Sequence, residues 1–461
     1  MKKYYVIVPE TLCIDKILNQ SITNTSNYNV DYFYWLVSQV LTKNTYDFEG
    51  NIENEWKALC SKILEKHPYN YKEHLRFLCS NQGTFDKILW RKEYSVGQCY
   101  SYKLSPSYFI SKARIYEITD KKLLKYFKKL RPDKIVYNNK FRRRYKFLAK
   151  YFNNNDLEID ESGAIMKNDE LFKTGYFDPT KKVFKQRNNL KQICSILNQE
   201  FNINYNNKTD GRIHTLITSL SKPLRHYITY QGKDLAEVDL TNSVPLFCYY
   251  ILKAITNSNS NKYLDTIIHQ SKIKYPFKMF SEGANILDKE EVEAFGKKVL
   301  NGTFYDCFVD ELSLLDKEDK DFDKDEYLKK KSVSIFNTEK IEPRKVMKKI
   351  MLSMMNAKIS QYKIEQKIFQ NQFPTILQWI NGFKKENHKL FSYLMLQTES
   401  YFMLDIVARK INSNPRINIP IITLHDCLIT TKSNLDTLYY EMQNILNREL
   451  GFTPKLTKKE W

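Results

Sequence analysis

Glycine and proline are scarce in this chain, and their scarcity is the strongest constraint on its fold. Only 12 Gly and 13 Pro occur among 461 residues. Because tight turns depend heavily on these two residues, a turn-rich β architecture is disfavoured and long helices are favoured. The 32 Tyr and 27 Phe supply enough apolar surface for a large core. We therefore expect a mostly helical α+β protein of two to four domains, or one large multi-lobed enzyme.

The charge of the chain is strongly positive. Its 73 Lys and Arg outnumber its 53 Asp and Glu, which gives a formal net charge of +20. A field of this sign concentrates polyanions near the surface, so nucleic-acid binding is favoured over a merely soluble basic protein. An anionic membrane is a weaker candidate, because no basic helix with a clean apolar face is evident. We expect no membrane partner, and we expect a monomer.

The eight cysteines predict neither a disulfide framework nor a zinc site. No two of them form a CxxC pair, and no Cys/His cluster has the spacing of zinc ligands. Buried free thiols in a reducing cytoplasm are the simplest interpretation. The N-terminus is basic but lacks the apolar run of a signal peptide, and no apolar segment is long enough to span a bilayer. The expected location is cytoplasmic.

The first 130 residues are predicted to form a mostly helical domain. Within it, residues 70–83 read as a short amphipathic helix that ends at Gly83. Two extended pieces follow, around residues 87–94 and 99–106. Helices followed by a small hairpin resemble a winged helix near 70–106. A helical packing domain with a surface hairpin remains equally open.

The next region, residues 131–207, is basic and is expected to be a helical, thumb-like connecting region. An acidic stretch at 156–162 lacks the further carboxylates that a two-metal nuclease needs, so we expect no proofreading exonuclease. Residues 310–331 are dense in mixed charge and poor in core residues. They predict an exposed helix or a flexible insertion.

A strand-to-helix segment at 236–252 places an aspartate before a turn. Alternation through Leu235, Val238 and Leu240 predicts a strand, and the apolar run after it predicts a buried helix capped by Asn242 or Ser243. Asp239 therefore lies near the end of the strand, where a carboxylate can hold a metal ion in a cleft. Taken alone, such an aspartate is more often a simple cap.

A second aspartate lies in a predicted hairpin near the C-terminus. Two β-rich pieces, 420–424 and 427–430, flank the dipeptide His425–Asp426, and a helix follows with Ser433 as its N-cap and Gly451 beyond its end. Asp426 is a turn former in the simplest interpretation. Apolar pieces on both sides nevertheless place it near a core, where a carboxylate needs a counter-charge such as a metal ion.

Two further segments carry basic residues. Residues 342–358 predict a helix on which Arg344, Lys348, Leu352 and Asn356 share one face. An Arg and a Lys one turn apart have the spacing to bind a triphosphate at two points, although a solvated basic stripe would look the same. The segment Asp210-GRIHT offers Arg212 and His214 for contacts with a phosphate backbone, and this signal is weak alone.

Taken in order, these segments resemble the family A DNA polymerases and the related single-subunit phage-type RNA polymerases. The resemblance covers residues 208–461. Residues 210–215 look like the family's Gly-Arg motif, 238–243 like motif A, 344–348 like motif B and 424–430 like motif C. Residues 373–380, the helix containing Gln397 and the terminal residues 452–461 also resemble family segments in the same order.

The resemblance implies a right-hand polymerase fold, with a palm sheet, helical fingers and a thumb-like region after the N-terminal domain. The implied palm comprises 208–300 and 396–461, and the charged insertion with the fingers helix occupies 301–395. Asp239 and Asp426 would hold two Mg²⁺ ions, with Mn²⁺ as a possible substitute. Arg344 and Lys348 would bind the triphosphate, and Lys348 would donate a proton to the leaving group. Contacts with the primer and template would come from Arg212, His214, His425 and Gln397.

The sequence departs from the family pattern where base and sugar are selected. Motif B usually continues through an aromatic residue to Tyr-Gly, but here Leu352, Asn356 and Ala357 occupy those positions. The Glu that excludes a ribose hydroxyl in the DNA enzymes is replaced by Val244. The expected activity is template-directed DNA synthesis from nucleoside triphosphates on a DNA template and primer. Two alternatives are a single-subunit RNA polymerase and a catalytically inactive nucleic-acid-binding or replication-initiation protein on the same scaffold.

Overall fold

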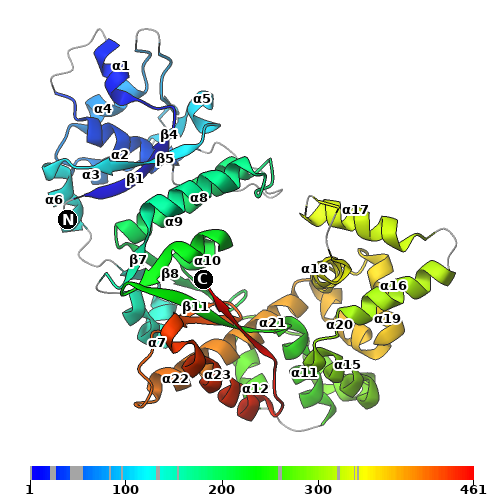
Figure 1. The fold of residues 1–461 in the computed structure, drawn as a ribbon. Helices are drawn as coiled ribbons and strands as arrows, with labels where there is room; N and C mark the ends of the chain where they lie inside the picture. Colours follow the sequence, from blue (N-terminus) through cyan, green and yellow to red (C-terminus); the bar gives the residue numbers. More distant parts are fainter. Residues whose placement is uncertain are drawn as a thin grey trace.

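The computed structural model describes residues 3–20, 27–41, 56–82, 85–94, 97–130, 135–152, 155–257, 262–318, 322–336, 338–339 and 342–461. Figure 1 shows an N-terminal region at the top, a central sheet below it and a lobe of helices to one side. The described chain is mostly helical with several small sheets, as the shortage of Gly and Pro predicts.

The N-terminal region contains six helices and five strands among its described residues, so the prediction of a mostly helical domain over residues 1–130 missed the strands. Strand β1 (Tyr4–Pro9) pairs antiparallel with β5 (Ala113–Ile118) along its whole length. Helix α2 (Val30–Leu41) packs against β1, and nearly all of its residues are buried. The other helices of this region are α1 (Ile14–Gln20), α5 (Pro106–Phe109) and α6 (Lys121–Leu130).

A small three-stranded sheet lies within this region. Its strands are β2 (Lys57–Ala58), β3 (Leu89–Arg91) and β4 (Ser101–Leu104), in the order β2-β4-β3. Helices α3 (Ser61–Leu64) and α4 (Tyr71–Leu78) connect β2 to β3. Asn70 caps α4 by accepting a hydrogen bond from the Lys72 amide, 3.1 Å away. The structure has the predicted helix and two extended pieces over 70–106, but the helix ends at Leu78 rather than at Gly83, which lies outside the described residues.

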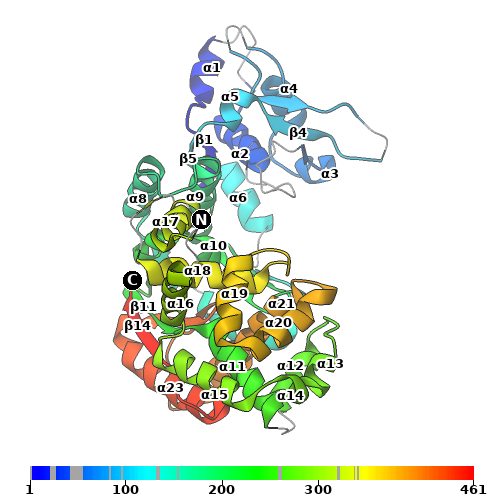
Figure 2. The ribbon, with the colours of Figure 1, turned by 90° about the vertical axis from the view of Figure 1, so that its right-hand side faces the viewer.

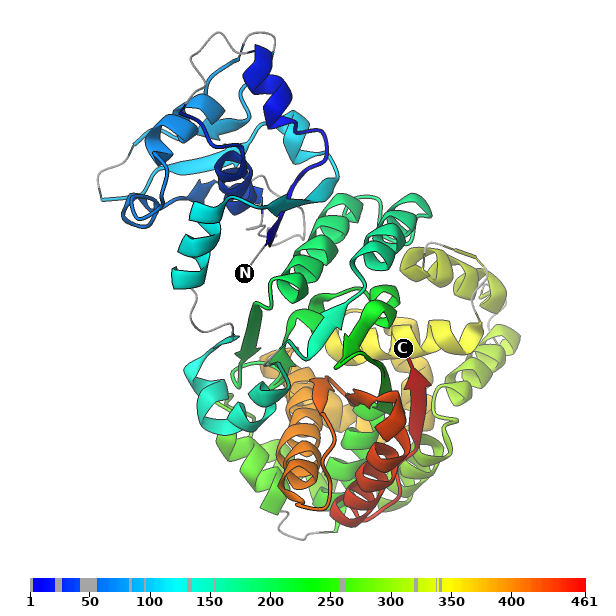
Figure 3. The ribbon, with the colours of Figure 1, turned by 60° about the vertical axis from the view of Figure 1, so that its left-hand side comes forward.

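A connecting region follows, and Figure 3 shows its helices between the N-terminal region and the central sheet. Two long helices, α8 (Glu161–Lys173) and α9 (Lys182–Leu197), pack against each other, and α9 also packs against β1 and β5. Helix α7 (Asn139–Ala149), the 3-10 turn η1 (Lys150–Phe152) and strands β6 (Ile135–Tyr137), β7 (Leu157–Ile159) and β8 (Phe201–Tyr205) complete the region. Strand β8 lies between β6 and β9 (Ile213–His214).

The central sheet is organised around strand β11 (Lys233–Leu240). Antiparallel neighbours flank it: β13 (Cys427–Thr431) on one side and β14 (Leu456–Glu460) on the other. Strand β12 (Ile422–Leu424) extends the sheet beyond β13, while β10 (Ile228–Tyr230) joins the start of β11 to β7. Short helices α10 (Leu216–Ser219) and η2 (Lys222–Tyr227) precede β10. The structure confirms the strand–turn–helix predicted at 236–252 and the hairpin predicted at 420–430.

In the sequence, the helical lobe lies between the two segments that form the central sheet. Figure 2 shows its helices below the N-terminal region. Helix α11 (Ser243–Thr256) leads from the sheet and packs against α15 (Lys289–Asn301) and α21 (Leu390–Ser400). The remaining helices are α12 (Lys262–Gln270), α13 (Lys278–Ser281), α14 (Gly283–Ile286), α16 (Asp306–Glu318), α17 (Lys324–Phe336), α18 (Pro343–Asn356), α19 (Lys363–Gln372) and α20 (Pro374–Glu386).

The charged stretch at 310–331 is less exposed than its composition predicts. It contributes to α16 and α17, which both pack against α18. Leu312 and Leu328 are buried in these contacts. Leu312, Leu315 and Leu328 fall on the inner sides of two helices and contribute to the core, whereas Leu314 is exposed.

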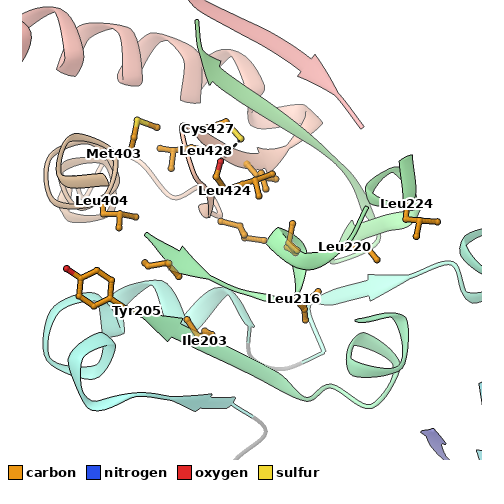
Figure 4. Close-up of a cluster of buried hydrophobic side chains, with 14 of the residues drawn as sticks. Ile203, Tyr205, Leu216, Leu220, Leu224, Met403, Leu404, Leu424, Cys427 and Leu428 are labelled. Atoms are coloured by element: carbon orange, nitrogen blue, oxygen red, sulfur yellow. Dashed lines mark hydrogen bonds between the residues drawn. The ribbon is translucent and has the colours of Figure 1, made fainter. Parts of the chain in front are cut away.

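The C-terminal part returns to the sheet through a π-helical segment. This segment, η3 (Tyr401–Ala408), continues α21 and leads into α22 (Arg409–Ser413). After the β12–β13 hairpin, η4 (Lys432–Asn434) precedes α23 (Leu435–Leu450), whose N-cap is Asn434 rather than the expected Ser433. Figure 4 shows Met403 and Leu404 packed beside Leu424, Cys427 and Leu428, so η3 and the hairpin share one apolar core.

None of the helices in the described ranges combines the length and the apolar character needed to cross a bilayer. Four of the eight cysteines are buried free thiols, whereas Cys13 and Cys99 are exposed and Cys60 and Cys79 are partly buried. The expectation of buried thiols is therefore right for only half of the set.

Candidate functional site

Asp239 is the second-last residue of β11, the most central strand of the sheet. It lies opposite Cys427 on β13 and opposite Thr457 on β14, one residue before β11 ends. Strands on both sides fix the backbone of Asp239 through ladder hydrogen bonds. Its carboxylate is half-buried at the edge where the strand gives way to α11.

Asp426 lies in the two-residue turn that joins β12 to β13. The closing pair of the hairpin is Leu424 with Cys427, so His425 and Asp426 form the bend, as the sequence predicts. The Asp426 carbonyl accepts a hydrogen bond from the Leu240 amide at 3.2 Å. The Ser243 hydroxyl donates to Oδ2 of Asp426 at 3.1 Å. These two contacts hold Asp426 against the residues that directly follow Asp239.

Both turns beside the two carboxylates contain a residue in the left-handed backbone region. Asn242 has φ 57° at the N-cap of α11, and His425 has φ 59°. Asn and His tolerate this region better than most residues, but it still costs free energy. The predicted cap at Asn242 is present as a backbone cap, and its side chain makes no capping bond. Backbone strain of this kind concentrates at functional sites.

Electrostatic repulsion characterises the site. Burial raises the pKa of Asp239 to about 7, the negative charges of Asp426 and Glu237 add to the rise, and Lys348 opposes it. Burial also raises the pKa of the Cys427 thiol well above its usual value, and the same three carboxylates contribute. Burial and neighbouring carboxylates thus both favour the protonated form of Asp239.

Glu237 belongs to this cluster, although the sequence analysis did not identify it. It is buried two residues before Asp239 and therefore on the same face of β11. The Trp461 indole donates to Glu237 Oε2 at 2.8 Å, and the Lys459 ammonium lies 3.7 Å from Oε1. Because these partners come from the C-terminal strand, no local pattern around Glu237 reveals its environment.

Helix α18 brings one of its two predicted phosphate-binding residues to the carboxylates. Lys348 is exposed, and its charge lowers the pKa of Asp239. Arg344 is engaged elsewhere, because its guanidinium lies 3.0 Å from the Asp306 carboxylate and donates to the Gly302 carbonyl at 2.7 Å. Lys348 therefore influences Asp239 through its charge, and its ammonium lies 5.9 Å from the ring centroid of Tyr305, whereas Arg344 is bound to Gly302 and to the first residue of α16.

The three residues at the expected sugar- and base-selecting positions differ in exposure. Val244 is half-buried in the first turn of α11 and packs against the core. Leu352 is half-buried on α18, and Asn356 is exposed at the end of that helix. Their positions on α11 and α18 agree with the helices predicted from the sequence.

Arg212 is neutralised by a carboxylate that the sequence analysis missed. Its Nε and Nη2 donate to Oε1 of Glu399 at 2.9 and 2.5 Å. Burial raises the pKa of Glu399 to about 7, Arg212 opposes the rise, and Asp426 adds to it. Glu399 thus pairs with Arg212 and also interacts electrostatically with Asp426 of the Asp239–Asp426 site. The two residues are 187 positions apart, so only the fold brings them together.

Two histidines lie beside this ion pair. His214 Nε2 is 3.0 Å from Oδ2 of Asp210, and its ring centroid is 6.0 Å from that of His425. Burial lowers the pKa of His425 to about 4, and the positive charges of Arg212 and His214 add to the effect. His425 is therefore neutral at physiological pH. Its Nδ1 has no hydrogen-bond partner among the described residues.

Gln397 has a structural position rather than an exposed one. The Tyr275 hydroxyl donates to its Oε1 at 3.0 Å, and its Nε2 donates to the Thr209 carbonyl at 2.8 Å. The amide is buried and its hydrogen bonds hold the loop that leads to Gly211. Gly211 has φ +68° and lies against Gln397 and Ser400, as a close backbone approach requires. Gln397 therefore braces this loop in the structure, and its nucleic-acid contact stays a prediction.

Asp239 and Asp426 supply oxygen donors, the ligand type that hard cations prefer. Within the described residues, no group of three or more His, Cys, Asp or Glu is arranged to hold a metal ion. Mg²⁺ does not need such a cage, because it is commonly held by one or two carboxylates together with water and substrate phosphates. The repulsion around Asp239 and the oxygen donors of both aspartates match this requirement.

Comparisons with known proteins identify no family for this chain. No family model matches it, and no curated protein matches it. Among solved structures, the polymerase (POL) domain of Pol1 from M. smegmatis, in complex with DNA primer-template and dNTP, is a distant neighbour with 9% identity and a TM-score of 0.28. The alignment covers 64% of this chain and 55% of that chain. A similarity this low supports no conclusion about fold or function.

Proposed function

We propose that this protein is a template-directed nucleotidyltransferase that acts as a DNA polymerase of the family A type. The observation that carries the proposal is the meeting of Asp239 and Asp426 across the β11–β13 ladder, with Lys348 acting on Asp239 from α18. Two close carboxylates with one nearby ammonium suit a reaction in which a phosphate passes between oxygens. The net charge of +20 suits a nucleic-acid substrate.

Each residue of the site has its own role in the proposed reaction. Asp239 and Asp426 would hold two Mg²⁺ ions, and the chemistry that such ions would supply is activation of a primer hydroxyl and neutralisation of triphosphate charge. Lys348 binds phosphate oxygens and delivers a proton to the pyrophosphate leaving group. His425 stays neutral and offers a ring nitrogen beside the carboxylates for the primer end. Arg212 acts through Glu399, and its role is to position the Gly211 segment near the duplex.

The proposal assigns right-hand polymerase roles to the observed parts. The central sheet serves as the palm, because it carries Asp239 on β11 and Asp426 in the turn that leads into the adjacent strand β13. Helices α16–α20 serve as the fingers, because Lys348 belongs to them, and α8–α9 serve as the thumb-like region. No carboxylate cluster for proofreading is assigned, so the enzyme is proposed to lack exonuclease activity.

Sugar selection is assigned to the first turn of α11 and the end of α18. Val244 replaces the glutamate that would repel a ribose hydroxyl, and Asn356 offers an amide that hydrogen-bonds such a hydroxyl. We assign deoxynucleotides as the preferred substrate and expect weak exclusion of ribonucleotides. A chain that incorporates only ribonucleotides would instead be a single-subunit RNA polymerase.

A primer-extension panel tests the proposal. The full chain is incubated with a labelled primer–template and either dNTPs or rNTPs, with Mg²⁺ or Mn²⁺. Extension by the wild type is expected, and Asp239→Asn or Asp426→Asn should reduce it by at least about a thousandfold. Asp234→Asn is the matched control, because Asp234 is exposed on the same strand as Asp239.

The same panel contains the results that would overturn the proposal. No incorporation of any nucleotide with either metal would identify an inactive scaffold protein that only binds nucleic acid. Equal loss in the Asp234→Asn control would mean that the strand tolerates no substitution, and the assignment of Asp239 would fall. Shortening of the primer by the wild type would contradict the absence of exonuclease activity.

A further inference from the structure

The small sheet of the N-terminal region has a topology that the polymerase assignment does not use. Along the chain, α2 is followed by β2, then by α3 and α4, and then by the hairpin β3–β4. The strands pair in the order β2-β4-β3, so the first short strand closes against the last strand of the hairpin. Helix, strand, two helices and a hairpin in this order form the winged variant of the helix-turn-helix.

Contacts between these elements show that they form one unit. Helix α2 packs against both α4 and β4. The Asn29 amide donates to Nε2 of His74 on α4 at 3.1 Å, and the Ile88 amide donates to the Leu78 carbonyl at the end of α4 at 3.0 Å. Helix α4 is therefore held from one side by α2 and from its end by the hairpin.

The outer face of α4 is basic. His74, Leu75, Phe77 and Leu78 are buried, whereas Lys72 and Arg76 are exposed one helical turn apart. Residues 56–104 contain nine Lys and Arg but only four Asp and Glu, so the positive charge of the surface is not balanced locally. Neither Lys72 nor Arg76 forms an ion pair with another described residue.

The hairpin carries cations that rest on aromatic rings. Lys103 lies 4.7 Å from the ring centroid of Trp56 and 4.8 Å from that of Trp90, and Arg91 lies 4.8 Å from that of Tyr100. A ring orders a cation without cancelling its charge, so these groups remain available to phosphates. Tyr94, near the tip of the hairpin, is 57% exposed.

We propose that the described residues of 27–109 bind duplex DNA as a winged helix-turn-helix, with α4 in the major groove and strands β3 and β4 against the adjoining backbone. The occupant is a duplex because an exposed helix of eight residues fits the major groove, and the flanking cations match phosphates on both sides of that groove. The surface lies apart from the Asp239–Asp426 site in sequence and in fold, as Figure 2 shows for α4 and β11. The proposal therefore does not depend on catalysis.

Equilibrium binding of the full chain tests the proposal without nucleotides or divalent metal. Fluorescence anisotropy with a labelled blunt duplex, over a series of salt concentrations, reports affinity and the number of phosphates contacted. The double variant Lys72→Glu/Arg76→Glu should weaken duplex binding roughly tenfold or more and lower the salt slope by about 2. The variant Lys72→Gln/Arg76→Gln should give a smaller loss and guards against a folding artefact.

The matched control is Lys289→Glu/Lys297→Glu on α15, which makes the same change in net charge at exposed positions. Binding by this control should stay within about twofold of the wild type. Equal loss in the control, unchanged binding by the α4 variant, or a defect confined to single-stranded DNA would each overturn the proposal. If the α4 variant lost binding to a protein partner but kept duplex binding, the proposal would also be overturned.

Failure of this proposal is distinguishable from failure of the proposed function. The double variant Asp239→Asn/Asp426→Asn should bind the blunt duplex as tightly as the wild type, because both substituted residues lie outside the N-terminal surface. If no nucleotide is ever incorporated but the α4 variant still loses duplex binding, the polymerase assignment falls and the winged helix stands.

Discussion

Asp239 faces Cys427 across the β11–β13 ladder, and this pairing places Asp426, the residue before Cys427, beside the end of β11. The two aspartates are 187 positions apart in the chain, yet the Leu240 amide donates directly to the Asp426 carbonyl. The sheet thus holds two like charges together that would separate if the backbone were free. Like charges that the backbone holds together in this way are typical of functional sites.

The first prediction is that Asp239→Asn stabilises the metal-free protein while it abolishes catalysis. Above a pKa of about 7 the Asp239 carboxylate is ionised, so at about pH 8 its repulsion by Asp426 and Glu237 is fully present. Removing the charge should raise the free energy of unfolding by roughly 1 kcal/mol. Urea unfolding in EDTA measures this change.

Mg²⁺ provides the complementary measurement. It should raise the stability of the wild type but leave Asp239→Asn nearly unchanged, because only the wild type keeps both ligands. Asp234→Asn serves as the control and should respond to Mg²⁺ as the wild type does. A destabilised Asp239→Asn in EDTA would show that the carboxylate is held for structural reasons.

The second prediction separates Lys348 from Arg344. Lys348→Met should lower kcat/KM for the nucleotide about 30- to 100-fold, since a charge-assisted phosphate contact is lost. Arg344→Met should instead lower the free energy of unfolding, because its guanidinium is bound to Asp306 and Gly302. Steady-state kinetics and urea unfolding of both variants measure the two effects, with exposed Lys349→Met as the control.

The opposite pattern would reassign the two residues. A large kinetic defect in Arg344→Met with unchanged stability would mean that Arg344 leaves Asp306 to bind the triphosphate, as the sequence resemblance implies. A Lys348→Met enzyme with normal kinetics would leave the site without its cation.

The third prediction concerns the ion pair between Arg212 and Glu399. Arg212→Met should destabilise the protein by about 3–5 kcal/mol, because it leaves a buried carboxylate without its partner. The double variant Arg212→Met/Glu399→Leu should recover most of that loss. A double-mutant cycle by urea unfolding measures the coupling between the two residues.

The rescued double variant also tests what Arg212 does for nucleic acid. If Arg212 acts only through Glu399, the double variant should bind primer–template nearly as well as the wild type. A double variant that is stable but has lost binding would show that Arg212 contacts the nucleic acid directly.

The parts of the site that were predictable from the sequence rest on local patterns. Alternating apolar residues before Asp239 and around His425–Asp426 identify the two strands and the hairpin, and Pro343 marks the start of α18. Each of these signals spans fewer than about 20 residues and arises from local backbone preferences. They were sufficient to find both aspartates and Lys348.

The parts that were not predictable depend on distant contacts. Glu399 and Glu237 acquire their significance from Arg212 and Trp461, which lie far away in the sequence. The N-terminal region was misjudged because its longest strands, β1 and β5, pair across more than a hundred residues and have no hairpin turn between them. Strands that pair at such a separation in the sequence leave no local residue pattern from which the pairing could be predicted.

The fourth prediction is a loss of stability in mild acid that arises from His67 in the N-terminal region. Its ring centroid lies 4.2 Å from that of Trp35 and 4.3 Å from that of Tyr126, and neither ring nitrogen has a hydrogen-bond partner among the described residues. Burial lowers the pKa of His67 to about 4 from 6.5. The unfolded chain therefore binds a proton between these values while the folded chain does not, so stability falls as the pH drops below 6.5.

Between about pH 7.5 and pH 5 this difference should cost the wild type about 2 kcal/mol. His67→Phe keeps an aromatic ring among the same neighbours but removes the titrating group, so its free energy of unfolding should vary less with pH by that amount. The control is His269→Phe, an exposed position on α12, which should follow the wild type. Urea unfolding at the two pH values measures all three proteins. If His67→Phe lost as much stability in acid as the wild type, the proton would have to bind elsewhere, and the aromatic cluster around His67 would have no part in the acid response.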